Sequence, residues 1–159
     1  MIADELEFKL EMNAIYHQRK AFYLKRWHMA MNFIVMLCGA GVVSKASQGS
    51  EALAVCLGLA VAIFSSLQLL FDFTKAVSLH HELYQKYKRL QVDFVKDGSD
   101  ANCARIEAEI HLIELDEPAH WPVLLEMCYE QVAVSTGREF KHPKPRRFFF
   151  LRQFAVFGI

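Results

Sequence analysis

The feature that most constrains this chain is an uncharged apolar stretch, residues 52–71, between Glu51 and Asp72. At 1.5 Å of rise per residue, a helix of about 20 residues spans about 30 Å, the thickness of the hydrocarbon core of a bilayer. The alternative is a helix wholly buried in a soluble bundle. However, a chain of 159 residues rarely builds a core that encloses such a helix on every side. The stretch therefore predicts a transmembrane helix.

A second uncharged run, 29–44, precedes it and is slightly short of a full span. An aromatic residue at the headgroup level and two basic residues that extend toward water lengthen the usable segment. These interface anchors are Lys25, Arg26 and Trp27. We expect a first transmembrane helix over 27–44. Because only the polar link 45–51 separates the two spans, they should form a helical hairpin.

Composition agrees with a membrane protein that has a large water-facing part, because 53% of the residues are hydrophobic and 23% are charged. The formal net charge is zero, which gives no reason to expect a nucleic-acid partner. The chain starts with acidic residues, so we expect no cleaved signal peptide. Lysine and arginine are concentrated before the first span and after the second, which predicts a multi-pass protein with both termini cytoplasmic.

Helical patterns continue on both sides of the hairpin. Residues 3–28 show apolar positions at helical spacing without proline or glycine, which predicts an amphipathic helix that leads into the first span. After Asp72 the apolar positions alternate by three and four, so the second span should continue as one helix of about 40 residues. Two shorter helices should follow the turn at 97–100, with Ser99 or Asp100 as a cap and Pro122 in the first turn of the last helix.

We therefore expect an all-α membrane protein, a two-transmembrane hairpin whose helices extend into a cytoplasmic helical bundle. The chain should form a single domain, 1–159. Its parts are a cytoplasmic N-terminal helix (1–26), transmembrane helix 1 (27–44), an external link (45–51), transmembrane helix 2 (52–71), cytoplasmic helices (72–141) and an aromatic-basic tail (142–159).

Small and polar residues form one stripe along the second span, at intervals of three and four. The stripe consists of Ala54, Gly58, Val61, Ser65, Gln68 and Asp72. In one interpretation, small residues allow close helix packing while serine and glutamine form bonds across it. In the other, several subunits bring their stripes around an axis and the polar residues line a water-filled path. The stripe is thus a candidate pore-lining or helix-packing surface.

Other chemistry-bearing residues give weak signals. The pair His80-His81 beside Glu82 predicts surface or interfacial histidines rather than a metal site, since adjacent helical residues point about 100° apart. The residues that could form an acid/base or metal site around the end of the third soluble helix are His111, Glu114, Asp116, Glu117 and His120. We interpret them as helix-end electrostatics and inter-helix hydrogen bonds.

The four cysteines, at positions 38, 56, 103 and 128, form no C-x-x-C pair and are interpreted as buried thiols. The sequence contains none of the common catalytic, phosphate-binding or zinc-binding motifs. We expect no catalytic residue, no cofactor and no bound metal, and a protein that is not an enzyme.

The order of several short elements resembles a known family. The elements are Phe71-Asp72-Phe73, His80 in a basic-aromatic helix, Glu114-Leu-Asp-Glu117-Pro118 and Cys128-Tyr129. Together with the hairpin, they resemble the SLATT family, the "SMODS and SLOG associating two-transmembrane effector" domains of bacterial conflict systems. Family members often have asparagine after the Cys-Tyr element, whereas this chain has Glu130. The resemblance implies a pore-forming or membrane-perturbing effector, with a sensor or signal molecule acting in trans.

These observations support two hypotheses. In the first, the chain is a homo-oligomeric inner-membrane protein that forms a pore or perturbs the lipid bilayer for a bacterial defence system. In the second, it is a non-conducting membrane anchor whose cytoplasmic helices recruit a partner.

Overall fold

The computed structural model describes residues 2–138, and 88% of these residues are helical with no strand among them. The described part contains five helices: α1 (Ile2–Ser47), α2 (Glu51–Phe71), α3 (Phe73–Lys96), α4 (Asp100–Leu115) and α5 (Pro122–Ser135). The expected all-α fold is confirmed. The aromatic-basic tail predicted for 142–159 lies outside the described residues.

The chain divides into two compact units. Among the described residues, the first unit contains 2–20 and 80–138, and the second contains 21–79. Helices α1 and α3 each contribute residues to both units. The expected single domain over 1–159 therefore stays a prediction.

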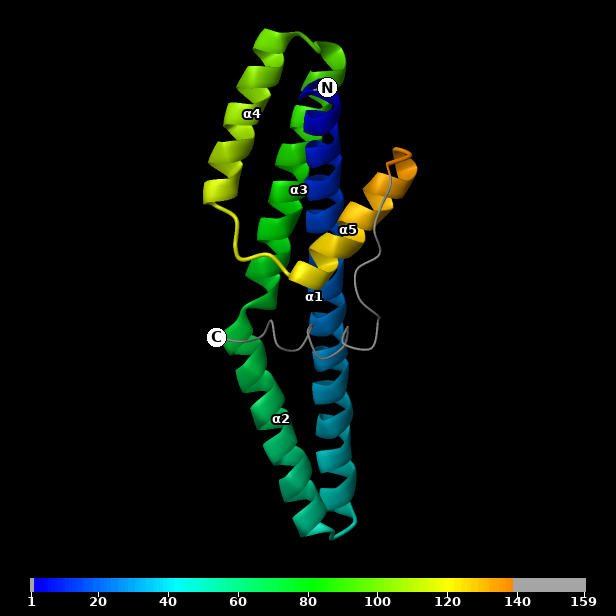
Figure 1. Ribbon diagram of the computed structural model, residues 1–159. Coiled ribbons are helices and arrows are strands. Elements are labelled where there is room, and N and C mark those ends of the chain that lie inside the picture. Colours follow the sequence, from blue (N-terminus) through cyan, green and yellow to red (C-terminus); the bar gives the residue numbers. More distant parts are fainter. Residues whose placement is uncertain (1, 139–159) are drawn as a thin grey trace. The chain divides into compact units, whose positions relative to one another are not determined.

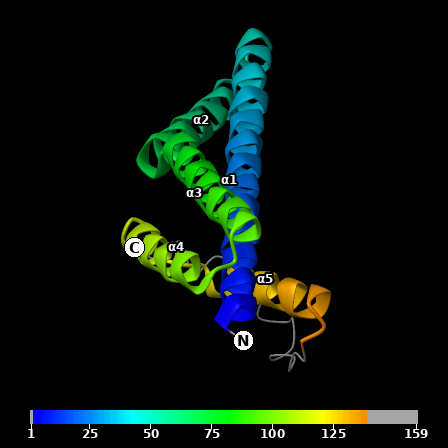
Figure 2. The same ribbon diagram turned by 90° about the horizontal axis from the view of Figure 1, so that it is seen from above.

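In the first unit, α1 has helices on two faces. One face packs against α3 and α4 in a core cluster that includes Leu6, Leu10, Ala14, Tyr87, Leu90, Cys103, Ile106 and Ile110. The other face contacts α5 through Phe8, Val132 and Ala133. Figures 1 and 2 show α4 and α5 on opposite sides of the N-terminal part of α1. The N-terminal part of α1 therefore has two buried faces rather than one.

Local signals explain where the shorter helices begin and end. The Ser99 hydroxyl accepts a hydrogen bond from the Asn102 N–H at 3.4 Å, which caps α4 as expected. Pro122 lies in the first turn of α5, where its missing N–H costs no intrahelical bond. Just after α5, Gly137 adopts φ 69°, the left-handed conformation that commonly ends a helix.

The second unit is an antiparallel hairpin. The connection between α1 and α2 is shorter than the expected link 45–51, because α1 ends at Ser47 and α2 begins at Glu51. It consists of residues 48–50, and Gly49 adopts φ 73°. The two helices approach closely, because a Cβ added at Gly41 would lie 2.9 Å from Leu57 Cδ1. Both helices are long and apolar enough to cross a membrane, and none of their most apolar segments is buried inside the described protein.

The prediction of one continuous helix through Asp72 is wrong. Asp72 has φ 38° and ψ 55°, a left-handed conformation that ends α2 at Phe71 and starts α3 at Phe73. Its Oδ1 accepts a hydrogen bond from the Lys75 N–H at 3.3 Å. Aspartate tolerates this conformation better than most residues because its short side chain can bond to the nearby backbone. The break therefore needs neither glycine nor proline.

Candidate functional site

The stripe predicted along the second span lies mostly on a half-buried side of α2. Ala54, Gly58, Val61, Ser65 and Gln68 are each partly buried, whereas Asp72 is exposed. Gln68 Nε2 donates a hydrogen bond to Asn32 Oδ1 of α1 at 3.1 Å. A side-chain amide bonded across two apolar helices satisfies polar groups that lipid could not satisfy. Gln68 therefore links α2 to α1 within the hairpin, and the roles of the stripe in helix packing and in pore lining both stay predictions.

The three interface anchors lie in the second unit, at the start of the first apolar run. Lys25 and Arg26 are exposed, and 41% of the Trp27 surface remains accessible. The Arg26 guanidinium lies 5.4 Å from the centre of the Phe22 ring, a cation–π distance. Exposed basic and aromatic side chains at this position are what a headgroup layer would contact.

The first unit contains a buried polar cluster formed by His17, His80, Tyr87 and Glu117. The His17 and His80 Nδ1 atoms are 3.0 Å apart. On the other side of the ring, His17 Nε2 lies 3.1 Å from Glu117 Oε1, and the Tyr87 hydroxyl donates to the same oxygen at 2.6 Å. The side chains of His17 and Glu117 are only 1% and 2% exposed. The cluster thus joins α1, α3 and the α4–α5 loop.

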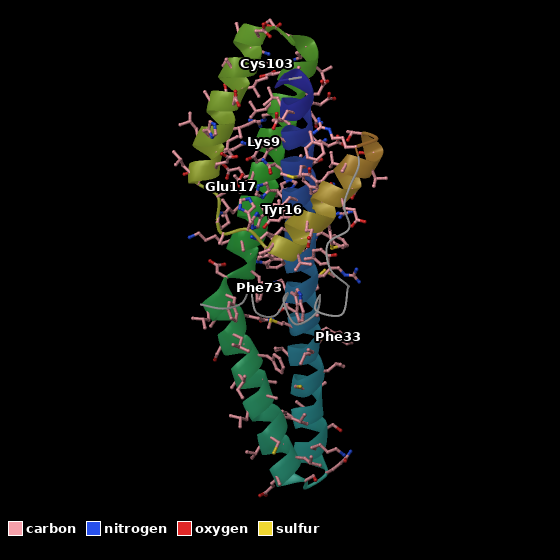
Figure 3. The ribbon with its side chains drawn as sticks, viewed as in Figure 1. Lys9, Tyr16, Phe33, Phe73, Cys103 and Glu117 are labelled. Carbon is pink, nitrogen blue, oxygen red and sulfur yellow. The ribbon has the colours of Figure 1, made fainter. Side chains whose placement is uncertain are left out.

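Further contacts hold the α4–α5 loop against α1. Lys20 Nζ donates to the Ala119 carbonyl at 3.0 Å, and the Trp121 N–H donates to the Tyr16 hydroxyl at 2.8 Å. The Lys20 ammonium also lies 5.2 Å from the centre of the Trp121 ring. Figure 3 shows Tyr16 on α1 and Glu117 just after α4. A loop lacks the regular backbone hydrogen bonds of a helix, so these bonds satisfy polar groups of the loop backbone.

Electrostatics fix the charge states inside the cluster. Burial opposes ionisation of Glu117, but the hydrogen bonds from His17 and Tyr87 outweigh it, so the pKa of this carboxyl lies below its usual range. Burial, together with the charge of Lys20, lowers the pKa of His80 to about 3, which keeps this ring neutral. Burial lowers the pKa of Lys20 to about 8, although the Glu117 carboxylate acts in the opposite direction.

These charge states constrain the hydrogen positions. An ionised Glu117 only accepts hydrogen bonds, so His17 Nε2 carries a hydrogen and donates it. The pair of Nδ1 atoms then shares one hydrogen between His17 and His80. His120 Nε2 lies 3.0 Å from Glu117 Oε2, within ion-pair distance of the carboxylate. Within the described residues no group of three or more histidine, cysteine or acidic side chains could hold a metal ion. The arrangement is a buried polar network whose outer member, His120, is 39% exposed.

The sequence located part of this cluster. The expected inter-helix hydrogen bonding near the end of the third soluble helix is confirmed for Glu117, and the expected electrostatic contact is confirmed for His120. Nearby, His111 Nδ1 contacts only Glu114 Oε2, at 3.0 Å. Of the two histidines expected at a surface or an interface, His81 is exposed, whereas His80 is 2% exposed and contacts His17 of α1.

The sequence interpretation did not identify the side chains of α1 and α3 as polar partners of Glu117 and the α4–α5 loop. These side chains are His17, Lys20, Tyr16 and Tyr87, all buried. A signal was present, because Asn13, His17 and Lys20 follow one another at helical spacing next to the apolar positions of α1. Polar residues repeated beside an apolar stripe predict a buried polar contact.

Of the cysteines, Cys103 and Cys128 are buried, Cys38 is half-buried and Cys56 is exposed, and all four are free thiols. Burial of the two soluble-helix thiols is therefore confirmed. No family model, no curated protein and no solved structure matches this chain.

Proposed function

We propose that this chain is a homo-oligomeric two-span protein of the bacterial inner membrane that forms a pore or perturbs the bilayer as an effector of a conflict or defence system. The observation that carries the proposal is the surface of α2, which has no buried residue despite its apolar sequence. Apolar surface on this scale requires lipid or another protein surface as its environment. The resemblance to the SLATT family supports the same class of function.

Oligomerisation follows from the small size of the hairpin. Two helices in contact leave no internal volume, and Gln68 already spans the space between them. A water-filled path would therefore require several copies around one axis. With lysine and arginine concentrated on one side of the membrane, both termini would be cytoplasmic, and the helices of the first unit could receive a signal from a sensor in trans.

Native mass spectrometry and chemical cross-linking of the full chain in several mild detergents test this proposal. We expect one defined oligomer that persists when the detergent is changed. A strict monomer in every detergent would contradict both the oligomer and the pore.

The bond between Gln68 and Asn32 favours a second candidate function, a non-conducting membrane anchor that recruits a cytoplasmic partner. In this case the polar residues of the spans serve only packing. The double substitution Ser65→Leu and Gln68→Leu separates the two candidates. A pore should lose cellular activity, whereas an anchor should retain it, and Leu69→Ile on the exposed side of α2 is the matched control.

An enzymatic function has little support. The most concentrated set of titratable groups, around Glu117, is closed to a substrate because His17, His80 and Tyr87 are at most 2% exposed. We propose that the protein is not an enzyme. Retained cellular function after alanine substitution of His111, which is exposed, and of Glu114, which is partly buried, would agree with this proposal.

A further inference from the structure

The junction of α2 and α3 is locally strained. Asp72 is the only non-glycine residue with positive φ among those that the structure describes. For an L-residue this conformation is sterically unfavourable relative to the right-handed helix, because Cβ comes close to the following carbonyl oxygen. The Lys75 N–H offsets part of this cost by donating to Asp72 Oδ1, and the Ala76 N–H donates to the Asp72 carbonyl at 3.1 Å. The bent junction is therefore only weakly preferred by local interactions.

Beside this junction, His28 of α1 has a buried ring nitrogen without a hydrogen-bond partner. Its Nδ1 is the one buried side-chain nitrogen or oxygen among the described residues that has no hydrogen-bond partner. The His28 ring packs against Phe73, the first residue of α3, with 6.3 Å between the ring centres. Phe73 is labelled in Figure 3 and is 3% exposed. An unpaired buried donor or acceptor is costly, so the bent conformation leaves a polar group without compensation.

The register of the hairpin relates these two features. Gln68 of α2 lies opposite Asn32 of α1, as their hydrogen bond shows. One helical turn beyond Gln68, in the direction of α3, is position 72. The residue opposite it, one turn back along the antiparallel α1, is His28. If α2 continued through position 72 as a regular helix, the Asp72 side chain would follow Ser65 and Gln68 on the same face and point toward His28.

We propose that the α2–α3 junction is a two-state hinge, in which the Asp72 carboxylate either caps α3 or accepts a hydrogen bond from His28 Nδ1. In the bent state Asp72 bonds to the Lys75 N–H and Phe73 covers His28. In the straight state position 72 is helical, α2 and α3 are continuous, and Asp72 satisfies His28. The hinge belongs to the hairpin itself and is independent of whether the spans conduct.

Distances between spin labels at Leu59→Cys and Ser78→Cys report the state of the hinge in reconstituted full-length protein whose four native cysteines are replaced. A continuous helix separates these Cα atoms by about 28 Å, and a bent junction brings them closer. Two variants calibrate the readout. Asp72→Ala should give the long distance, because alanine avoids positive φ, and Asp72→Gly should give the short one.

With native Asp72 we expect two populations of molecules, one at the long and one at the short distance. Loss of His28 Nδ1 should make the long-distance population smaller. His28→Phe keeps a ring against Phe73. It should lower the ratio of the long-distance population to the short-distance population by roughly fivefold or more. His28→Leu is the second variant, and Met29→Leu, at an exposed neighbour, should leave the ratio unchanged. A distribution that coincides with that of Asp72→Gly, or one that neither His28 variant changes, would overturn the hinge.

Discussion

At the scale of single residues, the chain concentrates its polar interactions on one carboxylate. Glu117 accepts hydrogen bonds from His17 and Tyr87, lies in ion-pair contact with His120, and has a side chain that is 2% exposed. A buried charge is stable only while its partners remain, because each lost donor leaves part of its desolvation cost uncompensated. The position of the α4–α5 loop therefore depends on side chains from α1 and α3.

Removal of a donor to Glu117 should destabilise the first unit. Tyr87→Phe deletes the hydroxyl that donates at 2.6 Å and keeps the buried ring, so we expect a loss of about 1–3 kcal/mol. Glu117→Ala leaves the His17 and Tyr87 donors without an acceptor and should cost more, about 3–5 kcal/mol. Thermal unfolding in detergent measures both. Glu107→Gln, on the exposed side of α4, is the control, and a Tyr87→Phe variant as stable as this control would contradict the role of the bond.

Lys20 gives the first unit a predictable pH dependence. Burial lowers its pKa from 10.5 to about 8, so between these values the unfolded chain binds more protons than the folded one. Stability should therefore rise with pH from about 8 to about 10, by an amount on the order of 1–2 kcal/mol.

Tyrosine ionisation sets the upper limit of this window. Burial raises the pKa of Tyr16 to about 12, so above pH 10 the unfolded chain loses its tyrosine protons first and stability should fall. Unfolding midpoints measured across the window test the prediction. Lys20→Met, which keeps the length of the side chain without its charge, should show a flatter profile. An equally steep rise in Lys20→Met would assign the effect to another group.

At the scale of helices, the sequence predicted what local chemistry determines. The helices of the two apolar runs, the cap at Ser99 and the proline at the start of α5 each depend on residues within a few positions, and the structure confirms them. The long α1 was also expected, because residues 3–28 contain no helix breaker before the first apolar run.

Long-range contacts determined the features that the sequence did not reveal. The burial of His80 depends on His17, 63 positions away, and that of Glu117 depends on His17, 100 positions away. A single sequence contains no direct signal for such pairs. The break at Asp72 was missed for a different reason. Its cost is small, so packing of Phe73 against His28 can decide between a bent and a continuous helix.

At the scale of the whole molecule, the two compact units differ in the surface that they expose. The first has a core of its own, with buried side chains from α1, α3, α4 and α5. The second exposes large apolar side chains along both helices of the hairpin, among them Phe33, Leu37, Leu59 and Leu69. An assembly of several copies in a bilayer would cover this surface with lipid and neighbouring hairpins, and would repeat every polar residue of the hairpin around a symmetry axis.

In such an assembly the repeated Asp72 carboxylates should select the permeant ion. Asp72 is exposed, and among the described residues no basic side chain forms an ion pair with it. Rings of acidic side chains favour cations. Reconstituted protein should therefore conduct cations over anions, and Asp72→Lys should reverse or abolish the preference. Asp72→Asn should weaken it while keeping a side chain that tolerates the left-handed conformation and can cap α3.

Reversal potentials in planar bilayers under a salt gradient measure these changes, with Glu82→Gln, an exposed acidic residue of α3, as the control for charge alone. If Asp72 acts only as a helix cap, Asp72→Lys should alter assembly and leave selectivity unchanged. Wild-type oligomers that stay electrically silent, both alone and with cell extract as a source of the signal, would contradict the pore and leave the membrane anchor as the better-supported function.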